Sequence, residues 1–323
     1  MAVSTLTEAV DNLYTTTWQE MQSTVRDQIY DGTPFWFWLK SKGGIKNQPG
    51  GRFIEVPLRY ATANNIAFIG RGGTTALNDQ EFLTTCQYEW RYLTASIVRY
   101  GIDDQKNRGK YQIINYAEAK LGNAKDGLAN QLESSAFSTQ SGLAINGLQD
   151  LVADSPSASA TVGGIAQATY SWWRNYTKNM TGLSFSVHGL QEMRTAYNTC
   201  GKNLEGEYPD IIMTGQTPYE YYEDLVTEQK RIVNQKLGDA GFENVQFKGI
   251  PLVWSPSCAA TRMYFLNTKY LYFMVDPMMN FDMTEWKSIP NQVNDRVAQI
   301  ITAGNLVTDR RRVHGVMHTI DTE

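Results

Sequence analysis

The stretch "FIGRGGTTAL", residues 68–77, lies between two segments whose side chains alternate with the period of a β-strand. The upstream segment is "RFIEVPLRY", residues 52–60, and the downstream segment is "QYEWRYLTASIVRY", residues 87–100. One face of the upstream segment carries Ile54, Val56, Leu58 and Tyr60. These patterns predict a β-hairpin, and the proline in the upstream segment predicts an edge strand, since proline cannot donate to a strand ladder.

The glycines at positions 70, 72 and 73 could cradle a phosphate or only turn the chain. A dinucleotide-binding fingerprint has the form Gly-x-Gly-x-x-Gly, and Thr75 stands at its third glycine position. A P-loop would continue with Lys-Ser or Lys-Thr, and neither pair follows these glycines. We therefore expect the glycines to form a turn.

The connection between the two predicted strands, residues 61–85, is long for a hairpin, since hairpin loops usually have about 2 to 5 residues. It is also rich in large apolar side chains, which a free disordered loop does not carry. These side chains belong to Ile66, Phe68, Ile69, Leu77, Phe82 and Leu83. We expect another surface to cover this connection.

The composition is that of a globular chain large enough for one large or two modest domains, with 323 residues of which 42% are hydrophobic and 12% aromatic. The formal charge of -4 argues against a dedicated nucleic-acid binder. Three widely spaced cysteines, Cys86, Cys200 and Cys258, indicate neither a disulfide framework nor a zinc site. The sequence shows neither a secretory signal nor an apolar run of the ~20 residues that cross a membrane.

Periodicity predicts the remaining parts in order. A capping box at Thr5 and Glu8 opens an amphipathic helical arm that ends before a Lys/Gly-rich link at residues 40–51. A long helix is predicted over residues 109–137, from apolar residues at three- and four-residue steps. From Ala144 onward strands alternate with short helices, which predicts a second domain, and residues 294–320 predict closing strands.

Candidate catalytic or metal-binding residues are few. His314 and His318 have the spacing of a helical metal site, but they lie in a strand-like stretch without the glutamate of a His-Glu-x-x-His helix. The pair Asp103 and Asp104 could bind a cation or cap a helix, and the cap needs no further assumption. No serine lies in a Gly-x-Ser-x-Gly elbow. We expect no catalytic residue, no metal and no cofactor.

Two clusters have alternative interpretations. The run Arg310-Arg311-Arg312 could contact phosphates, or be a solvated strand end or a salt-bridged interface, which is more usual. Four adjacent aromatic residues could form a platform for a glycan or pack against a partner, which we favour. They are Phe35, Trp36, Phe37 and Trp38.

The order of parts and several local stretches resemble the major capsid proteins of tailed bacteriophages, of the Hong Kong 97 type. The stretches are "TPFWFWLKSKG", "GGRFIEVPL", "FLTTCQYEWRYLTASIVRYGIDDQKNRGK", "AINGLQDLVAD" and "TVGGIAQATYSWWRN", and the resemblance covers essentially the whole chain. It implies an α+β fold with an N-terminal arm (1–50), an extended loop (51–100), a peripheral domain with a spine helix (101–143 and 286–323) and an axial domain (144–285). The predicted contacts between subunits are Phe35, Trp36, Phe37, Trp38, Ile66, Phe68, Ile69 and Arg71.

The resemblance also implies a structural function. Copies of the chain would assemble as pentamers and hexamers into an icosahedral shell around packaged double-stranded DNA, in the virion, after assembly in the host cytoplasm. Expected partners are a separate scaffolding protein, a portal, a cementing or decoration protein, and the DNA through weak non-specific contact. An encapsulin-type compartment and a glycan-binding phage appendage remain the alternatives. The type member of this fold links subunits through a lysine on the extended loop; this chain has no lysine from residue 47 to residue 105, which predicts a non-covalent shell.

Overall fold

The structure is a computed structural model. It describes residues 29–30, 33–63, 65–75, 77–78, 80–102, 116–158, 160–202, 207–226, 245–292 and 295–320. The predicted N-terminal helix with its capping box, and the predicted cap at Asp103 or Asp104, lie outside these residues.

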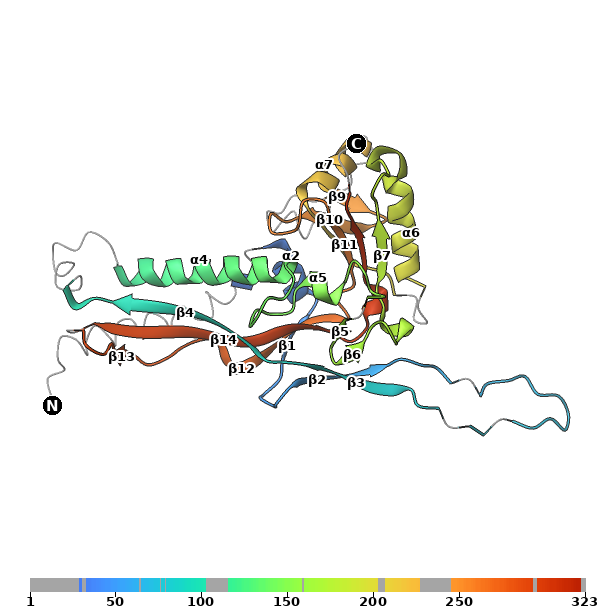
Figure 1. The fold of residues 1–323 in the computed structure, drawn as a ribbon, viewed down its shortest axis with the longest axis horizontal. Helices are drawn as coiled ribbons and strands as arrows, with labels where there is room; N and C mark the ends of the chain where they lie inside the picture. Colours follow the sequence, from blue (N-terminus) through green and yellow to red (C-terminus); the bar gives the residue numbers. More distant parts are fainter. Residues whose placement is uncertain are drawn as a thin grey trace.

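The molecule has three parts, which can be followed in Figure 1. An elongated body carries a long helix along a sheet, a block of helices and strands stands up from one end of the body, and a hairpin projects beyond that end. The α+β class predicted from the sequence is confirmed.

The body is built on a five-stranded sheet with the order β1-β12-β14-β13, in which β4 also pairs with β14. The two longest strands have 13 residues each and run antiparallel. Several of their apolar side chains, among them Val275, Ile300 and Leu306, are fully buried. The strands are β1 (Ile45–Asn47), β4 (Arg91–Arg99), β12 (Leu271–Met283), β13 (Lys287–Ser288) and β14 (Arg296–Thr308).

The long helix α4 (Tyr116–Phe137) lies along β4, as Figure 1 shows. It buries Leu121, Leu128 and Leu132, which recur at the spacing of one helix face. Its 22 residues correspond to a length of ~33 Å at ~1.5 Å per residue. The predicted helix is confirmed from residue 116 onward, and its predicted first turns lie outside the described residues.

The upright block contains a six-stranded sheet with the order β7-β15-β11-β8-β10-β9. The helices α6 (Leu190–Cys200) and α7 (Gln216–Leu225) pack on it and close a second apolar core around Phe185, Met193 and Phe265. The strand predicted from "DIIMTG" is β8, and all four of its side chains are buried. The strands are β7 (Tyr176–Asn179), β8 (Ile211–Thr214), β9 (Val245–Phe247), β10 (Ile250–Trp254), β11 (Met263–Leu266) and β15 (Gly315–His318).

A connecting region joins the body to the block. It follows α4 and contains no strand longer than two residues among those described. Its elements are α5 (Leu148–Leu151), β5 (Thr161–Val162), β6 (Ile165–Ala166) and the 3-10 turn η2 (Ser171–Trp173). Two further turns lie in the block or at its edge, the π-helical turn η3 (Phe185–Gly189) and the 3-10 turn η5 (Arg311–Val313).

The hairpin consists of β2 (Ile54–Arg59) and β3 (Leu83–Tyr88), and β2 buries Ile54, Val56 and Leu58 as predicted. The prediction that residues 87–100 form one strand is wrong. The chain leaves the hairpin at Glu89 and Trp90 and enters the body sheet as β4. Side chains replace the ladder at this break, since Asn305 Nδ2 donates to the Glu89 carbonyl at 2.8 Å and Trp90 Nε1 donates to the Gly51 carbonyl at 2.9 Å.

The sheets do not follow the predicted domain limits at residues 285 and 286. Strand β12 belongs to the body sheet, although the prediction placed it in the axial domain. Strand β15 pairs with β7 and β11 in the block, although the prediction placed it in the peripheral domain. The chain therefore crosses between the two sheets once more than predicted, three times in place of two. Periodicity cannot show this, because a strand has the same period in either sheet.

Candidate interaction surfaces

The tip of the hairpin is a tight turn, which answers the question raised by its glycines. Gly73 N donates to the Gly70 carbonyl at 3.0 Å, and Gly72 has a φ of +84°. A positive φ at the third residue of a turn strongly favours glycine. The predicted turn is confirmed, and the residues of this turn show no strand-to-helix junction of the kind that binds a dinucleotide.

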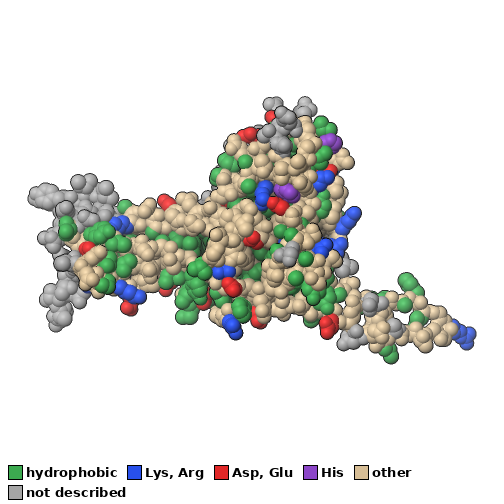
Figure 2. All heavy atoms as spheres, viewed as in Figure 1, with side chains coloured by type: hydrophobic (Ala, Val, Ile, Leu, Met, Phe, Trp, Pro, Cys, Tyr) green, Lys and Arg blue, Asp and Glu red, His purple; other side chains and the backbone are tan. Residues whose placement is uncertain are grey.

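The connection from Tyr60 to Phe82 carries apolar side chains that the described part of its own subunit leaves exposed. Ile66 is 83% exposed and Leu77 is 93% exposed, and Phe68 and Ile69 are exposed as well. Arg71 is exposed in the turn. Figure 2 shows green side chains spaced along the projecting loop and a basic side chain at its end. A large apolar side chain gains about 1.5 to 3 kcal/mol when it is fully buried, so this loop offers a strong contact surface.

The predicted contact role of the aromatic cluster is corrected for three of its four residues. They lie on α2 (Pro34–Ser41), whose first residue is the proline favoured at helix starts. Phe35, Trp36 and Trp38 are at most 5% exposed, so no surface is left for a neighbouring subunit or a glycan. Phe37 is half-buried against the same core. The sequence does not indicate that these rings are buried, because four adjacent aromatic residues include no polar position that would identify the solvent-exposed face of the helix.

The buried rings of α2 join the body core. Trp36 lies edge-on to Phe273 of β12, with ring centroids 5.1 Å apart, and Phe35 lies 5.5 Å from Phe137 at the end of α4. Edge-to-face pairs at this separation contribute beyond their buried area. Helix α2 therefore fixes the long helix and the body sheet to each other.

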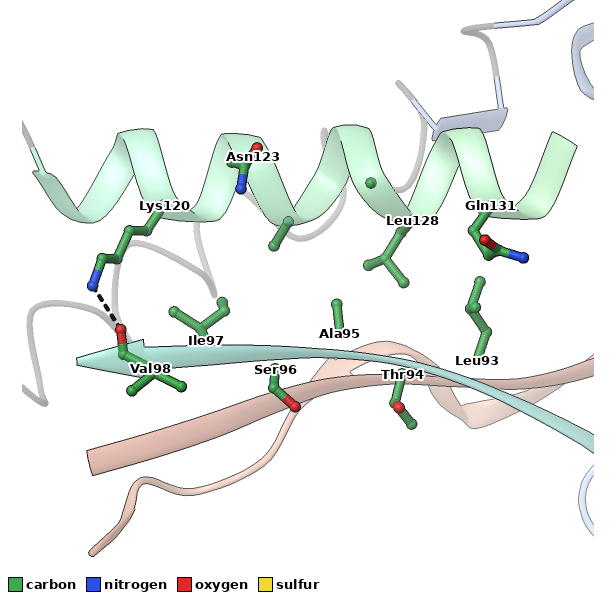
Figure 3. A pocket seen from close by; sticks show the side chains of 12 residues that line it. Leu93, Thr94, Ala95, Ser96, Ile97, Val98, Lys120, Asn123, Leu128 and Gln131 are labelled. Carbon is green, nitrogen blue, oxygen red and sulfur yellow. Dashed lines mark hydrogen bonds between the residues drawn. The ribbon is translucent and has the colours of Figure 1, made fainter. Parts of the chain in front are cut away.

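A groove of about 450 Å³ lies between α4 and β4. In Figure 3, Leu93, Ala95 and Ile97 point from β4 toward the helix, whereas Thr94 and Ser96 point away from it. Small residues keep the groove open, and a Cβ added at Gly127 would meet no atom within 4 Å. Lys120 donates to the Val98 carbonyl at 2.6 Å across one end. The groove thus has an apolar floor and a polar rim.

The central residue of the arginine run, Arg311, lies neither at a solvated strand end nor in a salt-bridged interface. Arg311 is 0% exposed, and burial lowers its pKa to about 10. Its guanidinium donates to five acceptors, all of which come from the connecting region. They are the carbonyls of Leu151, Trp173 and Asp150 and the side-chain oxygens of Gln167 and Asn175. The sequence carries no signal for this, because the acceptors lie 136 to 161 residues away.

The histidine pair is not brought together as a metal site. His314 is fully buried, and burial, with Arg311 nearby, lowers its pKa to about 3. Its Nδ1 accepts from Asn267 N at 3.2 Å, and its Nε2 lies 3.3 Å from Thr308 Oγ1, so both ring nitrogens are engaged. Among the described residues, no group of three or more His, Cys, Asp or Glu side chains is placed to hold a metal ion.

The three cysteines are buried thiols, and burial raises the pKa of each thiol to about 12. A thiol with such a pKa stays protonated near neutral pH and is a poor nucleophile.

In the part of the chain that the structure describes, no helix is long and apolar enough to span a bilayer.

A buried carboxylate that the sequence did not reveal lies where the body meets the block. Glu133 of α4 is 4% exposed, and its Oε1 accepts from Ser255 Oγ just after β10 at 2.8 Å. Burial raises its pKa to about 7. Its Oε2 has no hydrogen-bond partner among the described residues.

Comparison with known proteins finds likenesses among solved structures. No protein-family model matches the sequence, and a search of curated proteins finds no significant match. Solved structures do match. The capsid of cyanophage A-1(L) aligns over 85% of this chain and 90% of its own, with 19% identity and a TM-score of 0.63.

Two other solved structures extend the comparison. The SrpI encapsulin of Synechococcus elongatus PCC 7942 aligns over 90% of this chain and 89% of its own, with 10% identity and a TM-score of 0.55. The mature capsid of bacteriophage PhiM1 aligns over 86% of both chains, with 14% identity and a TM-score of 0.51. The chain therefore has the Hong Kong 97-type fold, and the resemblance predicted from the sequence is confirmed at the level of the fold.

Proposed function

We propose that this protein is the major capsid protein of a tailed bacteriophage, many copies of which form a closed shell around double-stranded DNA. The observation that carries the proposal is the projecting loop, whose apolar side chains have no cover in their own subunit. The fold supports it, because solved phage capsid subunits share the architecture over most of their length. The missing cover would be another copy of the same chain.

The parts of the fold would then take the roles that the resemblance implies, with limits adjusted to the sheets. The hairpin and its loop would be the extended loop that reaches a neighbour. The body, with α4 and the five-stranded sheet, would be the peripheral domain. The block with the six-stranded sheet would be the axial domain, which gathers around fivefold and sixfold centres.

We also assign the groove between α4 and β4 to a contact with a neighbouring subunit, because it too leaves apolar side chains partly open. The floor of the groove between α4 and β4 includes Leu93 and Ala95, which are only partly buried. Apolar surface that a subunit leaves open in this way is typical of a protein contact. We assign Ile66, Phe68, Ile69 and Arg71 to the contact made by the loop, and we no longer assign Phe35, Trp36 or Trp38 to it.

The role requires no catalysis. A wall with net negative charge suits packaged DNA, since it makes only weak, non-specific contact with the phosphates. Assembly in the host cytoplasm would use a separate scaffolding protein and a portal, and a cementing protein would reinforce the finished virion. The buried, protonated thiols leave this shell without disulfide links.

An encapsulin-type compartment is the second candidate, because the SrpI encapsulin shares the fold at a TM-score of 0.55. The glycan-binding appendage loses its main support, since the aromatic cluster is in the core. The contents of the particles separate the two shell functions. Particles purified from producing cells should contain nuclease-protected double-stranded DNA; particles that carry an enzyme and no DNA would establish the compartment instead.

A further inference from the structure

A pocket of about 520 Å³ lies at the root of the hairpin, where β2 leaves the body. Three chain segments form it besides the hairpin: the turn η2, the end of α6, and the corner between β14 and η5. The residues that matter for its chemistry are Arg59, Tyr60, Trp172, Lys202, Arg310 and Arg312. We call this the root pocket. Its volume is in the range of sites that enclose a small ligand or a few residues of a peptide.

One wall of the root pocket is aromatic and rigid. The rings of Tyr60 and Trp172 are stacked, with centroids 4.9 Å apart and planes 22° from parallel. Tyr60 belongs to the hairpin and Trp172 to the connecting region, so the stack ties the hairpin root to the connecting region. Both side chains are only partly buried, which leaves apolar area open toward the pocket.

The root pocket is basic although the chain is acidic. Arg59, Lys202, Arg310 and Arg312 contribute four positive charges and Asp309 one negative charge, a balance of +3, whereas the whole chain carries -4. Asp309 is already engaged, because its carboxylate accepts a hydrogen bond from the Tyr272 hydroxyl. Arg59, Lys202 and Arg312 have exposed side chains at the rim.

We infer that the root pocket binds a short acidic peptide segment of a partner protein. A carboxylate of the segment would pair with the guanidinium groups of Arg59 and Arg312, which can hold a carboxylate in two parallel hydrogen bonds. A neighbouring apolar side chain would lie against Tyr60 and Trp172. Because the segment would contact the hairpin, the connecting region and η5 at once, it would hold the hairpin in one direction.

The shape of the pocket favours a peptide over nucleic acid. Proteins that bind DNA present a basic stripe or face, whereas these cations surround a recess with an aromatic wall. A carboxylate next to an apolar side chain matches both features of the recess. If the proposed shell function holds, the segment would belong to a scaffolding or cementing protein; the binding itself does not depend on that function.

The test uses the full-length chain and does not require shells. A fluorescein-labelled peptide, Glu-Asp-Phe-Asp-Glu, is titrated with the protein, and its anisotropy is followed at low and moderate salt. The uncharged analogue Gln-Asn-Phe-Asn-Gln is the control ligand, and sodium tripolyphosphate is the competitor. The variants are Arg312→Gln, Arg59→Gln and Trp172→Ala. Arg194→Gln removes a matched exposed charge on α6, away from the pocket.

We expect the acidic peptide to bind the wild type, and the binding to weaken as the salt concentration rises. Arg312→Gln and Arg59→Gln should each weaken the binding by about tenfold, because each removes a charged hydrogen-bonded contact. Trp172→Ala should weaken it while Arg194→Gln leaves it unchanged, and the uncharged peptide should bind poorly. Equal binding to all variants, or none to the wild type, would overturn the inference. So would tripolyphosphate binding in place of the peptide, or variants that change only the association of the chain with itself. Because both charge variants alter exposed residues, a circular dichroism spectrum like that of the wild type is expected for each.

Discussion

Ser255 donates a hydrogen bond to Glu133 across the junction between the block and α4, with 2.8 Å between Ser255 Oγ and Glu133 Oε1. Hydrogen bonding does not compensate this carboxylate for the loss of water, and burial raises the pKa of Glu133 from 4.5 to about 7. The junction between two parts of the subunit therefore contains a group that titrates near neutral pH.

The first prediction concerns the pH dependence of stability. The folded pKa lies above the unfolded one, so the folded state favours the protonated form; this contribution is fully present below pH 4.5 and is lost as the pH rises through about 7. Glu133→Gln removes the charge and keeps an acceptor for Ser255. At about pH 8 the variant should unfold with a free energy about 3 kcal/mol higher than the wild type, with little difference at about pH 4.5. Chemical denaturation at both pH values measures this, and equal shifts at the two would contradict it.

The second prediction separates a core role from a contact role on α2. Trp36→Ala should destabilise the isolated subunit by about 3 to 5 kcal/mol, because it empties a site packed against Phe35 and Phe273. Phe37→Ala, one residue along on the half-buried side, should cost less than half as much. Urea unfolding of unassembled subunits gives both values. If the Trp36→Ala subunit unfolds with the same free energy as the wild type and fails only to assemble, Trp36 is a contact residue and not a core residue.

The third prediction concerns the buried arginine. Arg311→Met keeps the volume but leaves five acceptors in the connecting region without their donor, which should cost about 3 to 5 kcal/mol. The neighbour Arg312 is exposed, and Arg312→Met should change the unfolding free energy by less than about 0.5 kcal/mol. Thermal unfolding of the two variants makes the comparison, and similar melting temperatures would show that Arg311 does not hold the connecting region.

Many of the helices and strands can be predicted from the periodicity of apolar residues, and the features that cannot be predicted in this way depend on contacts between distant parts of the chain. The buried face of β2, the strand β8 and the helix α4 depend on spacing within a few residues, which the sequence displays directly. The break between β3 and β4 at Glu89 and Trp90 cannot be predicted from local spacing, because it depends on Asn305, which lies more than two hundred residues later in the chain.

The same distinction holds for the candidate surfaces. An apolar loop too long for a hairpin was recognisable, because exposure there results from a local excess of large side chains. The burial of Arg311 and Glu133 was not recognisable, because their partners come together only in the folded chain.

The fourth prediction is that the shell is not covalently linked. From residue 47 to residue 105 the chain has no lysine, so the hairpin and its loop lack an amine nucleophile. Arginine does not replace it, because its guanidinium stays protonated in proteins. Particles boiled in detergent with reductant should therefore give one band at the mass of the single chain on a denaturing gel. A ladder of multiples would show that this interpretation of the loop is wrong.

The most direct measurement is electron microscopy of purified protein with and without the apolar loop surface. The variant carries Ile66→Ser, Phe68→Ser, Ile69→Ser and Leu77→Ser, and the control carries Asn65→Ser, Thr74→Ser, Thr75→Ser and Asn78→Ser on the same loop. The wild type and the control should form closed shells, whereas the variant should remain as unassembled subunits with an unchanged melting temperature, because these side chains serve a neighbour and not their own core. Closed shells of normal stability from the variant, or a wild type that stays a compact monomer, would contradict the account.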